Sequence, residues 1–267
     1  MKCMFRYSFM IIDFSAIEGD IQATLNFLKN CGYAGVELNL TACVLDRLDE
    51  LESILLSNEL VVPALLTGAA YEEGLCLSSP DPEIRQRTVE RLKSYLEIAR
   101  RFNALLVVGL LQGLRRDEAV TKVANHRIIA GLREVGLAAI QQGVEVVIEP
   151  VNHLQVGFNN TLAEVQQLIT AIDVPVFKPM LDTIHMNIEE TSLTKPVYSC
   201  GKSLGHVHLC ESNGGVFGRG NIDFKSVLHA LELVGYDGFA SVKVYRKASL
   251  EEGAQSSIEL LRNHFQV

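Results

Sequence analysis

The sequence contains no run of about 18 apolar residues, which is the length a helix needs to span a bilayer. Near the N-terminus, the apolar stretch Phe9–Ile12 follows Arg6 closely and ends at Asp13. That stretch is too short for the apolar region of a signal peptide. We therefore expect a first β-strand there, no membrane association and a cytoplasmic location.

Cysteine is scarce, with six residues in 267, and no two of them form a Cys-x-x-Cys pair. Disulfide-stabilised domains are small and dense in cysteine, so this spacing excludes that class. We expect reduced thiols, which agrees with a cytoplasmic location.

Basic residues are fewer than acidic ones: 24 Lys and Arg against 32 Asp and Glu give a formal net charge of −8. Such a chain is a poor general binder of phosphate backbones, so no nucleic-acid partner is expected. A small anionic substrate is not excluded, because one pocket can be positive on an acidic protein. The hydrophobic fraction of 48% and charged fraction of 21% are those of an ordinary globular protein.

The chain shows a regular alternation of short β-rich runs and longer amphipathic runs. The runs that predict strands are Cys3–Met10, Gly35–Leu40, Leu60–Leu66, Ala104–Gly109, Val144–Glu149, Val176–Asp182, His206–Cys210 and Phe239–Tyr245. The runs that predict helices are Ile21–Asn30, Leu45–Leu56, Ile84–Phe102, Asp117–Gln142, Leu162–Ile172, Phe224–Val234 and Leu250–Phe265, with a short one near Ile184–Glu190.

Eight strands that alternate with helices predict an α/β fold of the single (β/α)8 TIM-barrel type, with one domain over residues 1–267. An open doubly wound sheet is the alternative. The sequence has no glycine-rich phosphate loop after its first strand, which disfavours that alternative. It also has no linker or low-complexity tract that would divide the chain.

Polar residues stand at the ends of the last four predicted strands. In a barrel, alternate residues point inward, and catalytic groups lie at the C-terminal strand ends. The inward sets are Val147 and Glu149; Val176, Lys178, Met180 and Asp182; His206, His208 and Cys210; and Phe239, Ser241, Lys243 and Tyr245.

Glu149, Asp182 and His208 together offer the oxygen and nitrogen donors that suit a divalent ion such as Mn²⁺, Mg²⁺, Co²⁺ or Zn²⁺. Buried charges need a partner, so a metal or an ion-pair network is expected at these strand ends. In the simpler interpretation, these groups only form salt bridges with one another.

Three motifs in this order resemble the xylose-isomerase-like superfamily. They are Glu-Pro-x-Asn from Glu149, Asp-x-x-His from Asp182 and Gly-His-x-His from Gly205. Within the superfamily, the chain is most similar to sugar and sugar-phosphate isomerases and epimerases of the D-tagatose 3-epimerase kind. Supporting fragments lie at Gly32–Leu38, Gly218–Phe224 and Gly235–Gly238, so the resemblance covers essentially the whole barrel.

The resemblance implies that Glu149, Asp182 and His208 are metal ligands, with Mn²⁺ as the first candidate. It implies that His185 contacts substrate oxygens and that Tyr245 lines the pocket. His206 would lie one layer below and orient the site, although a hydrogen-bonded core histidine is an equal alternative.

The sequence departs from the family pattern at several site positions. The fourth metal ligand of the family, a glutamate that also serves as an acid/base group, is replaced by Lys243. A second acid that usually contacts substrate is replaced by Gln155, and an arginine of the same motif by His153. Gly214 stands where an arginine grips substrate, and Arg219 is the candidate substitute.

These residues predict an isomerase or epimerase that transfers a proton next to the carbonyl of a sugar or sugar derivative. Glu149 and Lys243 are the candidate acid/base groups. One alternative is a lyase or dehydratase acting on a keto-sugar or inosose. Another is a barrel that binds sugar without catalysis. The partner is a small carbohydrate in each case. The sequence leaves open whether the chain forms a homo-oligomer.

A nuclease like the apurinic endonucleases of the same superfamily is disfavoured. Those enzymes add His and Glu ligands from the third and fourth strands. The corresponding ends here, Leu65–Gly68 and Val108–Gly109, contain no His, Asp or Glu.

Overall fold

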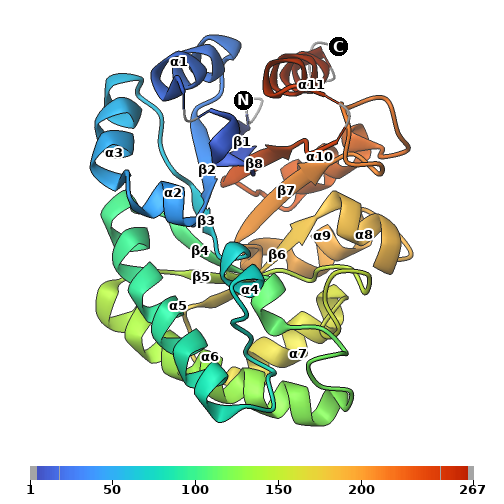
Figure 1. Cartoon of the computed structure of the whole chain (residues 1–267). Coiled ribbons are helices and arrows are strands. Elements are labelled where there is room, and N and C mark those ends of the chain that lie inside the picture. Colours follow the sequence, from blue (N-terminus) through green and yellow to red (C-terminus); the bar gives the residue numbers. More distant parts are fainter. Residues whose placement is uncertain (1–4, 18, 247, 264–267) are drawn as a thin grey trace. The chain divides into compact units, whose positions relative to one another are not determined.

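A computed structural model describes residues 5–17, 19–246 and 248–263 of the chain. In this part of the chain, eight parallel strands in chain order form a closed barrel, which confirms the predicted fold class (Figure 1). The strands are β1 (Arg6–Ile11), β2 (Gly35–Asn39), β3 (Ala64–Leu66), β4 (Leu105–Val108), β5 (Val146–Ile148), β6 (Phe177–Asp182), β7 (His206–Cys210) and β8 (Phe239–Lys243).

Helices connect successive strands, as right-handed βα units require. They are α1 (Ile21–Cys31), α2 (Ala42–Leu45), α3 (Leu48–Ser57), α4 (Ala69–Glu72), α5 (Pro82–Phe102), α6 (Thr121–Gln142), α7 (Leu162–Ile172), α8 (Thr183–Glu189), α9 (Lys195–Cys200), α10 (Phe224–Leu233) and α11 (Leu250–Asn263). The described part of the chain also contains three short 3₁₀ turns, at Phe14–Ala16, Leu110–Gln112 and Gly201–Ser203. Within the described residues, no helix has both the length and the apolar composition that crossing a membrane requires.

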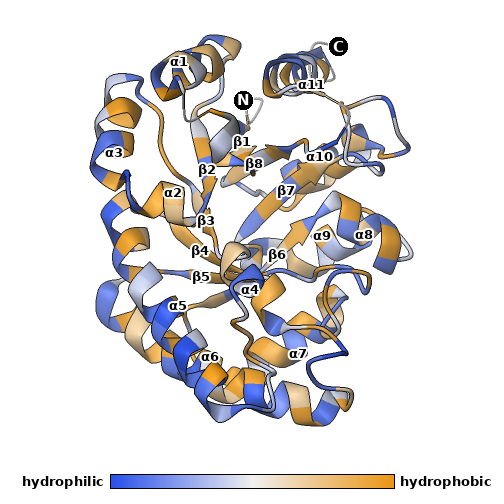
Figure 2. Ribbon diagram, in the orientation of Figure 1, coloured by the Kyte–Doolittle hydropathy of each residue, from blue (hydrophilic) through white to orange (hydrophobic). Residues whose placement is uncertain are grey.

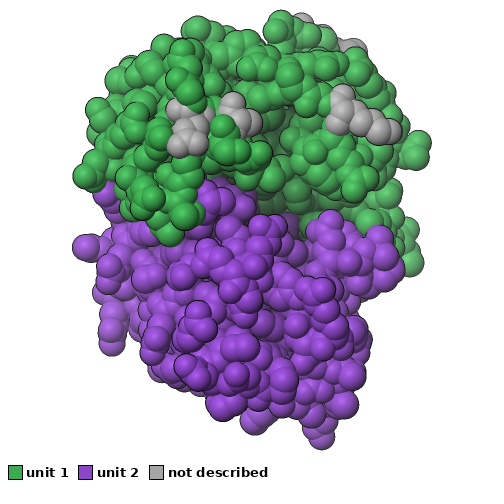
Figure 3. Space-filling view, in the orientation of Figure 1, with its two compact units in different colours: residues 1–38, 42–63, 181–267 green, residues 39–41, 64–180 purple. Residues whose placement is uncertain are grey.

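The chain divides into two compact units, which Figure 3 colours separately. Unit 1 comprises residues 1–38, 42–63 and 181–267, and unit 2 comprises residues 39–41 and 64–180. Neither unit is one continuous stretch of chain, and each contains several barrel strands. A single domain over residues 1–267 therefore stays a prediction.

In unit 1, β1 pairs with both β2 and β8, and β8 also pairs with β7. The register aligns Ser8 and His208 with Ser241, and Met10 with Glu37. Ser8, Glu37, His208 and Ser241 are all fully buried. Because strand side chains alternate between faces, this register collects polar groups on one face of these strands.

In unit 2 the buried strand residues are apolar instead. Ala64, Val107, Val147 and Met180 form one cluster, and the partly buried Leu66 and Leu105 pack against it. The predicted inward positions of Val147 and Met180 are thereby supported. Glu149 lies two residues after Val147, and Asp182 lies two residues after Met180. Because strand side chains alternate, each acid has the same parity as the buried residue before it, which means that it points to the same face.

The hydropathy of the residues follows this organisation in Figure 2. Hydrophobic residues dominate β4 and β5, whereas α5 and α6 carry both hydrophobic and hydrophilic residues along their length. That mixture is typical of helices with one buried face and one face in solvent.

Several strands are shorter than the sequence pattern predicted. Of Leu60–Leu66, only Ala64–Leu66 belongs to β3, and Val61 makes an isolated bridge to Gly35. Pro63 has no N–H group to donate to a strand ladder, which explains the break. The first strand begins at Arg6, and Cys3 and Met4 of its predicted range lie outside the described residues.

Two predicted helices also differ. The run Leu45–Leu56 contains parts of α2 and α3, because the backbone at Arg47 (φ −126°, ψ 21°) leaves the helical region. Helix α6 begins at Thr121 rather than Asp117. The Asp117 carboxylate instead accepts the N–H of Leu114 at 2.6 Å and the hydroxyl of Tyr71 at 2.8 Å, which stabilises a turn.

Helix starts are well marked in the sequence. Asp81 caps α5 by accepting the N–H of Glu83, with Pro82 at the first helical position. Helix α7 begins with a capping box, in which Thr161 accepts the N–H of Glu164 and the Glu164 carboxylate accepts the N–H of Thr161. These caps fix the direction in which the chain enters each helix.

We expect Thr161→Ala to lower the free energy of unfolding by about 1 kcal/mol, because the capping acceptor of α7 is lost. Urea denaturation measures this change. The matched control is Thr170→Ala in the same helix, where an exposed hydroxyl bonds the Gln166 carbonyl. Equal losses for the two variants would contradict the role of the cap.

Candidate active site

A cluster of buried polar side chains lies in unit 1, where β1, β2, β6, β7, β8 and α8 contribute residues. Its buried members are Ser8, Glu37, Asp182, Thr183, His185, His206, His208 and Ser241. The side chain of Lys243, at the end of β8, is 16% exposed and belongs to the same cluster. Four of the eight predicted site residues are among these, namely Asp182, His185, His208 and Lys243.

Glu37 joins the two histidines of β7. Its carboxylate accepts hydrogen bonds from Nε2 of His206 at 2.5 Å, from Nε2 of His208 at 2.9 Å and from the hydroxyl of Ser241. Burial by itself would raise the pKa of Glu37, but attraction to the two histidines and their hydrogen bonds hold that pKa well below its ordinary value. Glu37 is therefore an ionised carboxylate at neutral pH.

Glu37, His206 and His208 have ligand atoms within 4.8 Å of one another, so the trio is one candidate group for a metal ion. Two ligands that bind one ion at about 2.1 Å each lie about 3 Å or more apart. The His206–Glu37 distance of 2.5 Å is shorter than that. The trio is a hydrogen-bonded network, and an ion does not fit between these atoms.

Asp182 is the last residue of β6, and its two carboxylate oxygens contact different groups. Oδ1 accepts the N–H of Ile184 at 3.0 Å and caps α8. Oδ2 lies 2.7 Å from Nζ of Lys243, 3.7 Å from Nε2 of His185 and 3.7 Å from Nδ1 of His208. Burial would raise the pKa of Asp182, but Lys243, then His185 and His208, hold it well below its ordinary value.

The strand ends that carry Asp182 and His208 are held together by Thr183. Its hydroxyl donates to the Cys210 carbonyl at 2.7 Å, and the Cys210 N–H donates back to the hydroxyl at 2.7 Å. These two hydrogen bonds connect the first residue of α8 to the last residue of β7. It positions His185, which is 2% exposed in the first turn of α8, beside the Asp182 carboxylate.

The positions of the Asp182 and His208 side-chain atoms indicate whether a divalent cation fits between them. Oδ2 of Asp182 and Nδ1 of His208 are 3.7 Å apart, which is compatible with both atoms binding one ion. The Lys243 ammonium already contacts the same oxygen. A dication about 4 Å from a charged Lys243 would be repelled by on the order of 8 kcal/mol at an effective dielectric of about 20. The two ligands fit a cation, therefore, only if Lys243 moves away or becomes neutral.

Glu149 belongs to unit 2, directly after β5, and is 7% exposed. Its carbonyl accepts a hydrogen bond from Nε2 of Gln112 at 3.2 Å, and Asn159 donates to Oε1 of Gln112 at 2.9 Å. A Cβ atom on Gly109 would lie 2.7 Å from Oε2 of Glu149. The missing side chain of Gly109 thus leaves room for the Glu149 carboxylate.

The remaining predicted residues lie at different places. Tyr245 follows β8, is 37% exposed, and its ring centroid lies 5.9 Å from Nζ of Lys243. Gln155 is exposed in the loop after β5. The side chain of Arg219 is 64% exposed and pairs with Glu252 of α11 at 3.0 Å. Unit 1 thus brings Asp182, His185, His208, Lys243 and Tyr245 together, whereas the described ion pair of Arg219 joins it to α11.

Two buried acids were not singled out by the sequence analysis. Glu37 could have been found as the one charged residue of β2, between Val36 and Leu38. Glu211, directly after β7, accepts backbone N–H groups of Ser212 at 2.8 Å, Ile222 at 3.0 Å and Gly218 at 3.1 Å. That pattern assigns Glu211 to holding the loop before α10 in shape.

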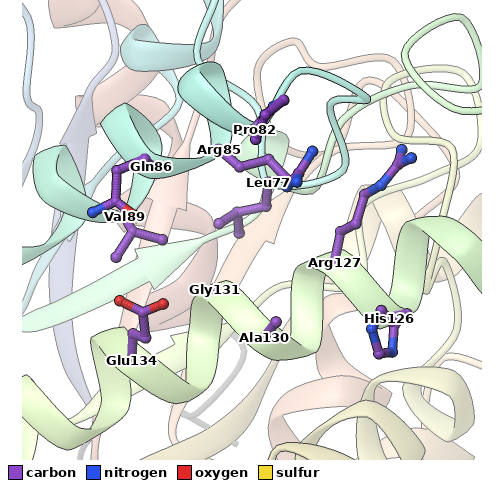
Figure 4. A pocket seen from close by; sticks show the side chains of 10 residues that line it. All are labelled: Leu77, Pro82, Arg85, Gln86, Val89, His126, Arg127, Ala130, Gly131 and Glu134. Carbon is purple, nitrogen blue, oxygen red and sulfur yellow. The ribbon is translucent and has the colours of Figure 1, made fainter.

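A surface pocket of about 320 Å³ lies between α5 and α6 in unit 2 (Figure 4). Arg85 and Arg127 line it, but both donate to backbone carbonyls, at 2.7 Å to Ser79 and 3.0 Å to Ser78. Its described lining contains no residue that the sequence predicted for catalysis.

Comparison with known proteins supports the resemblance seen in the motifs. A family model described as xylose isomerase-like TIM barrel matches residues 25–264. The D-psicose 3-epimerase of Ruminiclostridium cellulolyticum is 33% identical over 166 residues, which are 61% of this chain and 57% of that protein. The L-ribulose 3-epimerase of Mesorhizobium japonicum is 32% identical over 190 residues, 70% of this chain and 64% of that protein.

Solved structures share the same fold. The D-allulose 3-epimerase from Methylomonas sp., in complex with D-allulose, has a TM-score of 0.84 at 22% identity, covering 98% of this chain and 97% of that one. The D-psicose 3-epimerase with D-tagatose from Clostridium cellulolyticum H10 has a TM-score of 0.77 at 25% identity, covering 95% and 89%. The predicted similarity to ketose 3-epimerases is confirmed.

We expect the metal-free protein, measured in a chelator, to lose stability as the pH falls below about 4.5. Glu37 and Asp182 have lowered pKa values in the folded state, against about 4.3 and 3.9 in an unfolded chain. Their contribution is complete above the unfolded values and is lost as the pH falls towards the folded ones.

The comparison that isolates this effect is Glu37→Gln, measured by urea denaturation between pH 3 and pH 7. The variant should be less stable at pH 7 and should lose less stability on acidification than the wild type. Glu59→Gln is the control, because the side chain of Glu59 is 85% exposed. Parallel curves for wild type and Glu37→Gln would show that Glu37 is not held ionised by its neighbours.

Proposed function

The chain belongs to the xylose isomerase-like TIM-barrel family, and we propose that it catalyses the epimerisation or isomerisation of a small sugar by moving a proton next to a carbonyl. The observation that carries the proposal is the contact set of Asp182 in unit 1, where a buried carboxylate faces His185, His208 and Lys243 within 3.7 Å. Proton transfer and binding of sugar oxygens both need such groups.

The substrate class we propose is a ketose or a related keto-sugar. The matching relatives are named D-psicose 3-epimerase and L-ribulose 3-epimerase, and both names denote ketose epimerases. A polyol chain suits a site of carboxylate, imidazole and ammonium groups, because each can hydrogen-bond a hydroxyl.

We propose that Glu149, Asp182 and His208 hold a divalent cation, Mn²⁺ first, with Mg²⁺, Co²⁺ and Zn²⁺ as alternatives. The separation of Asp182 and His208 supports two of these ligands. For Glu149 the support is its parity with the buried Val147 and the place of β5 next to β6 in the barrel order. A cation there would polarise the carbonyl and hydroxyl oxygens of the sugar.

In this proposal Glu149 takes the proton from the carbon next to the carbonyl. Glu149 is 7% exposed, so bulk water has little access to the carboxylate that would accept this proton. His185 holds a substrate oxygen from the first turn of α8, and Tyr245 lines the same side of the site as Lys243. Gln155 and Arg219 are the candidates for contacts from the loops.

Lys243 is the second proton-transfer group of the proposal. Binding of a cation to Asp182 would release Nζ of Lys243 from that carboxylate, because like charges repel. The released amine can accept a proton, and its ammonium form can donate one to the opposite face of the sugar carbon. Glu149 and Lys243 then share the two steps of an epimerisation.

A lyase or dehydratase on a keto-sugar is the second candidate, and Lys243 is the observation that favours it. Replacing a second carboxylate by an amine removes the matched pair of bases that epimerisation uses. Elimination needs one base next to the carbonyl and one acid at the leaving group. An unsaturated or dehydrated product would identify this activity.

The test of the proposed function is turnover of candidate ketoses in D₂O in the presence of Mn²⁺. A stereoisomer of the substrate should appear with deuterium at the epimerised carbon, because the abstracted proton exchanges with solvent. Glu149→Gln should lower kcat at least 100-fold, the lower end of what a positioned general base contributes. Mass spectrometry and NMR measure both.

The matched control is Glu145→Gln, because Glu145 precedes β5 and its 49% exposed side chain pairs with Lys178 on the surface. That variant should retain wild-type turnover. Conversion without deuterium incorporation, and without an isotope effect from substrate deuterated at that carbon, would contradict proton abstraction.

We further expect the affinity for Mn²⁺ to increase from wild type to Lys243→Met and again to Lys243→Glu. The first change removes a cation from Asp182, and the second adds a carboxylate ligand. Titration calorimetry measures the affinities. Lys178→Met is the control, since Lys178 pairs with Glu145 and should leave affinity unchanged. Equal affinities in all variants would show that Lys243 does not compete with a metal.

A further inference from the structure

We infer that Gln112 is a positioning residue that fixes the direction of the Glu149 side chain from the segment after β4. The inference rests on the proposed function for its catalytic consequence, because Glu149 is the proton acceptor there. The hydrogen bonds that carry it lie entirely within unit 2. It adds a residue that contacts neither the substrate nor a cation in that proposal.

Glu149 directly follows β5, where the strand ladder no longer holds the chain. The next residue, Pro150, has no N–H group with which to continue the pairing. The N–H of Glu149 donates to the Val108 carbonyl at 2.9 Å. Its carbonyl accepts from the Val151 N–H at 3.0 Å and from Nε2 of Gln112 at 3.2 Å. The side-chain bond from Gln112 therefore connects the end of β5 to the segment that follows β4.

The same segment forms the surface beneath the Glu149 side chain. Gln112 ends the 3₁₀ turn Leu110–Gln112, which begins directly after Gly109. A Cβ atom on Gly109 would lie 2.7 Å from Oε2 of Glu149 and 3.4 Å from its Cβ, so the side chain passes directly over the glycine. The hydrogen bond and this surface belong to one short turn. Loss of the bond therefore changes how the carboxylate lies on the turn.

The orientation of the Gln112 amide is set by Asn159. Nδ2 of Asn159 donates to Oε1 of Gln112 at 2.9 Å and to Oδ1 of Asn125 at 3.0 Å. Because the amide oxygen of Gln112 accepts this bond, its NH₂ group faces the Glu149 carbonyl, which can only accept. Gln112 is 0% exposed and Asn159 is 5% exposed, so bulk water has little access to replace either partner.

The variant that tests this bond is Gln112→Met, because methionine has a similar length and volume but no NH₂ group to donate. We expect kcat for the ketose substrate to fall by about 10- to 100-fold, since misplacing a reacting group by about 1 Å can cost about 100-fold. KM should change less than kcat, because Gln112 does not contact the substrate in the proposal.

A double-mutant cycle separates positioning from a general loss of structure. In the Glu149→Gln background the proton acceptor is already gone, so Gln112→Met should lower the residual kcat by less than about 2-fold. A second variant, Asn159→Gly, suits the left-handed backbone at φ +54° and removes the donor to Gln112. It should lower kcat less than Gln112→Met does, because the NH₂ group of Gln112 remains.

The matched control is Thr88→Val in α5, which also loses buried hydrogen bonds in unit 2. The Thr88 hydroxyl donates to the Ile84 carbonyl at 2.7 Å and accepts the Cys76 N–H at 2.9 Å, and Thr88 is 0% exposed. Neither bond involves Glu149. Thr88→Val should therefore lower the stability measured in urea and leave kcat at the wild-type value.

Crystal structures of the wild type and of Gln112→Met give a measurement that does not depend on activity. We expect the Glu149 carboxylate to lie over Gly109 in the wild type and to leave that position in the variant. An unchanged Glu149 position in Gln112→Met, or an equal loss of kcat in the Glu149→Gln background, would overturn the inference. If the carboxylate shifts as expected but the wild type converts no ketose, the positioning role of Gln112 is supported and the proposed function fails.

Discussion

The hydrogen bonds between Glu37 and the two histidines of β7 are the interaction on which the polar interior of unit 1 depends. A fully buried carboxylate is costly unless several donors satisfy it. Here the donors come from His206, His208 and Ser241, so neighbouring strands must keep the register that aligns His208 with Ser241. A shift by one residue would turn these donors to the opposite face and leave the charge unsatisfied.

Asp182 is also a fully buried carboxylate, and its charge is balanced by the ammonium group of Lys243. Its Oδ1 caps α8, and its Oδ2 contacts the ammonium of Lys243 at 2.7 Å. In the proposed function this contact has a consequence, because the ammonium and a divalent ion would compete for one oxygen of Asp182. Lys243 therefore neutralises the buried Asp182 and, in the proposed function, would also affect metal binding. The apolar cluster of Ala64, Val107, Val147 and Met180 in unit 2 carries no such demand and supplies packing alone.

Much of the site could be predicted because it follows local rules. The two-residue period of strands assigned Asp182, His208 and Lys243 to inward positions, and the Asp-x-x-His spacing placed His185 one turn into a helix. Glu37 could not be assigned a role in the same way. Its partners His206 and Ser241 lie 169 and 204 residues away in the chain, and no local pattern relates such positions.

The sequence by itself determined the alternation of strands and helices, the parity of the strand residues and the helix caps at Asp81 and Thr161, because each depends on neighbours within a few residues. Only the tertiary structure decided that the Lys243 ammonium contacts Asp182, that Arg219 pairs with Glu252, and that His208 presents Nε2 to Glu37. The physical reason is that a buried charge takes the partner that the folded strands bring within hydrogen-bonding distance. That distance depends on register and packing between segments that are remote in the sequence.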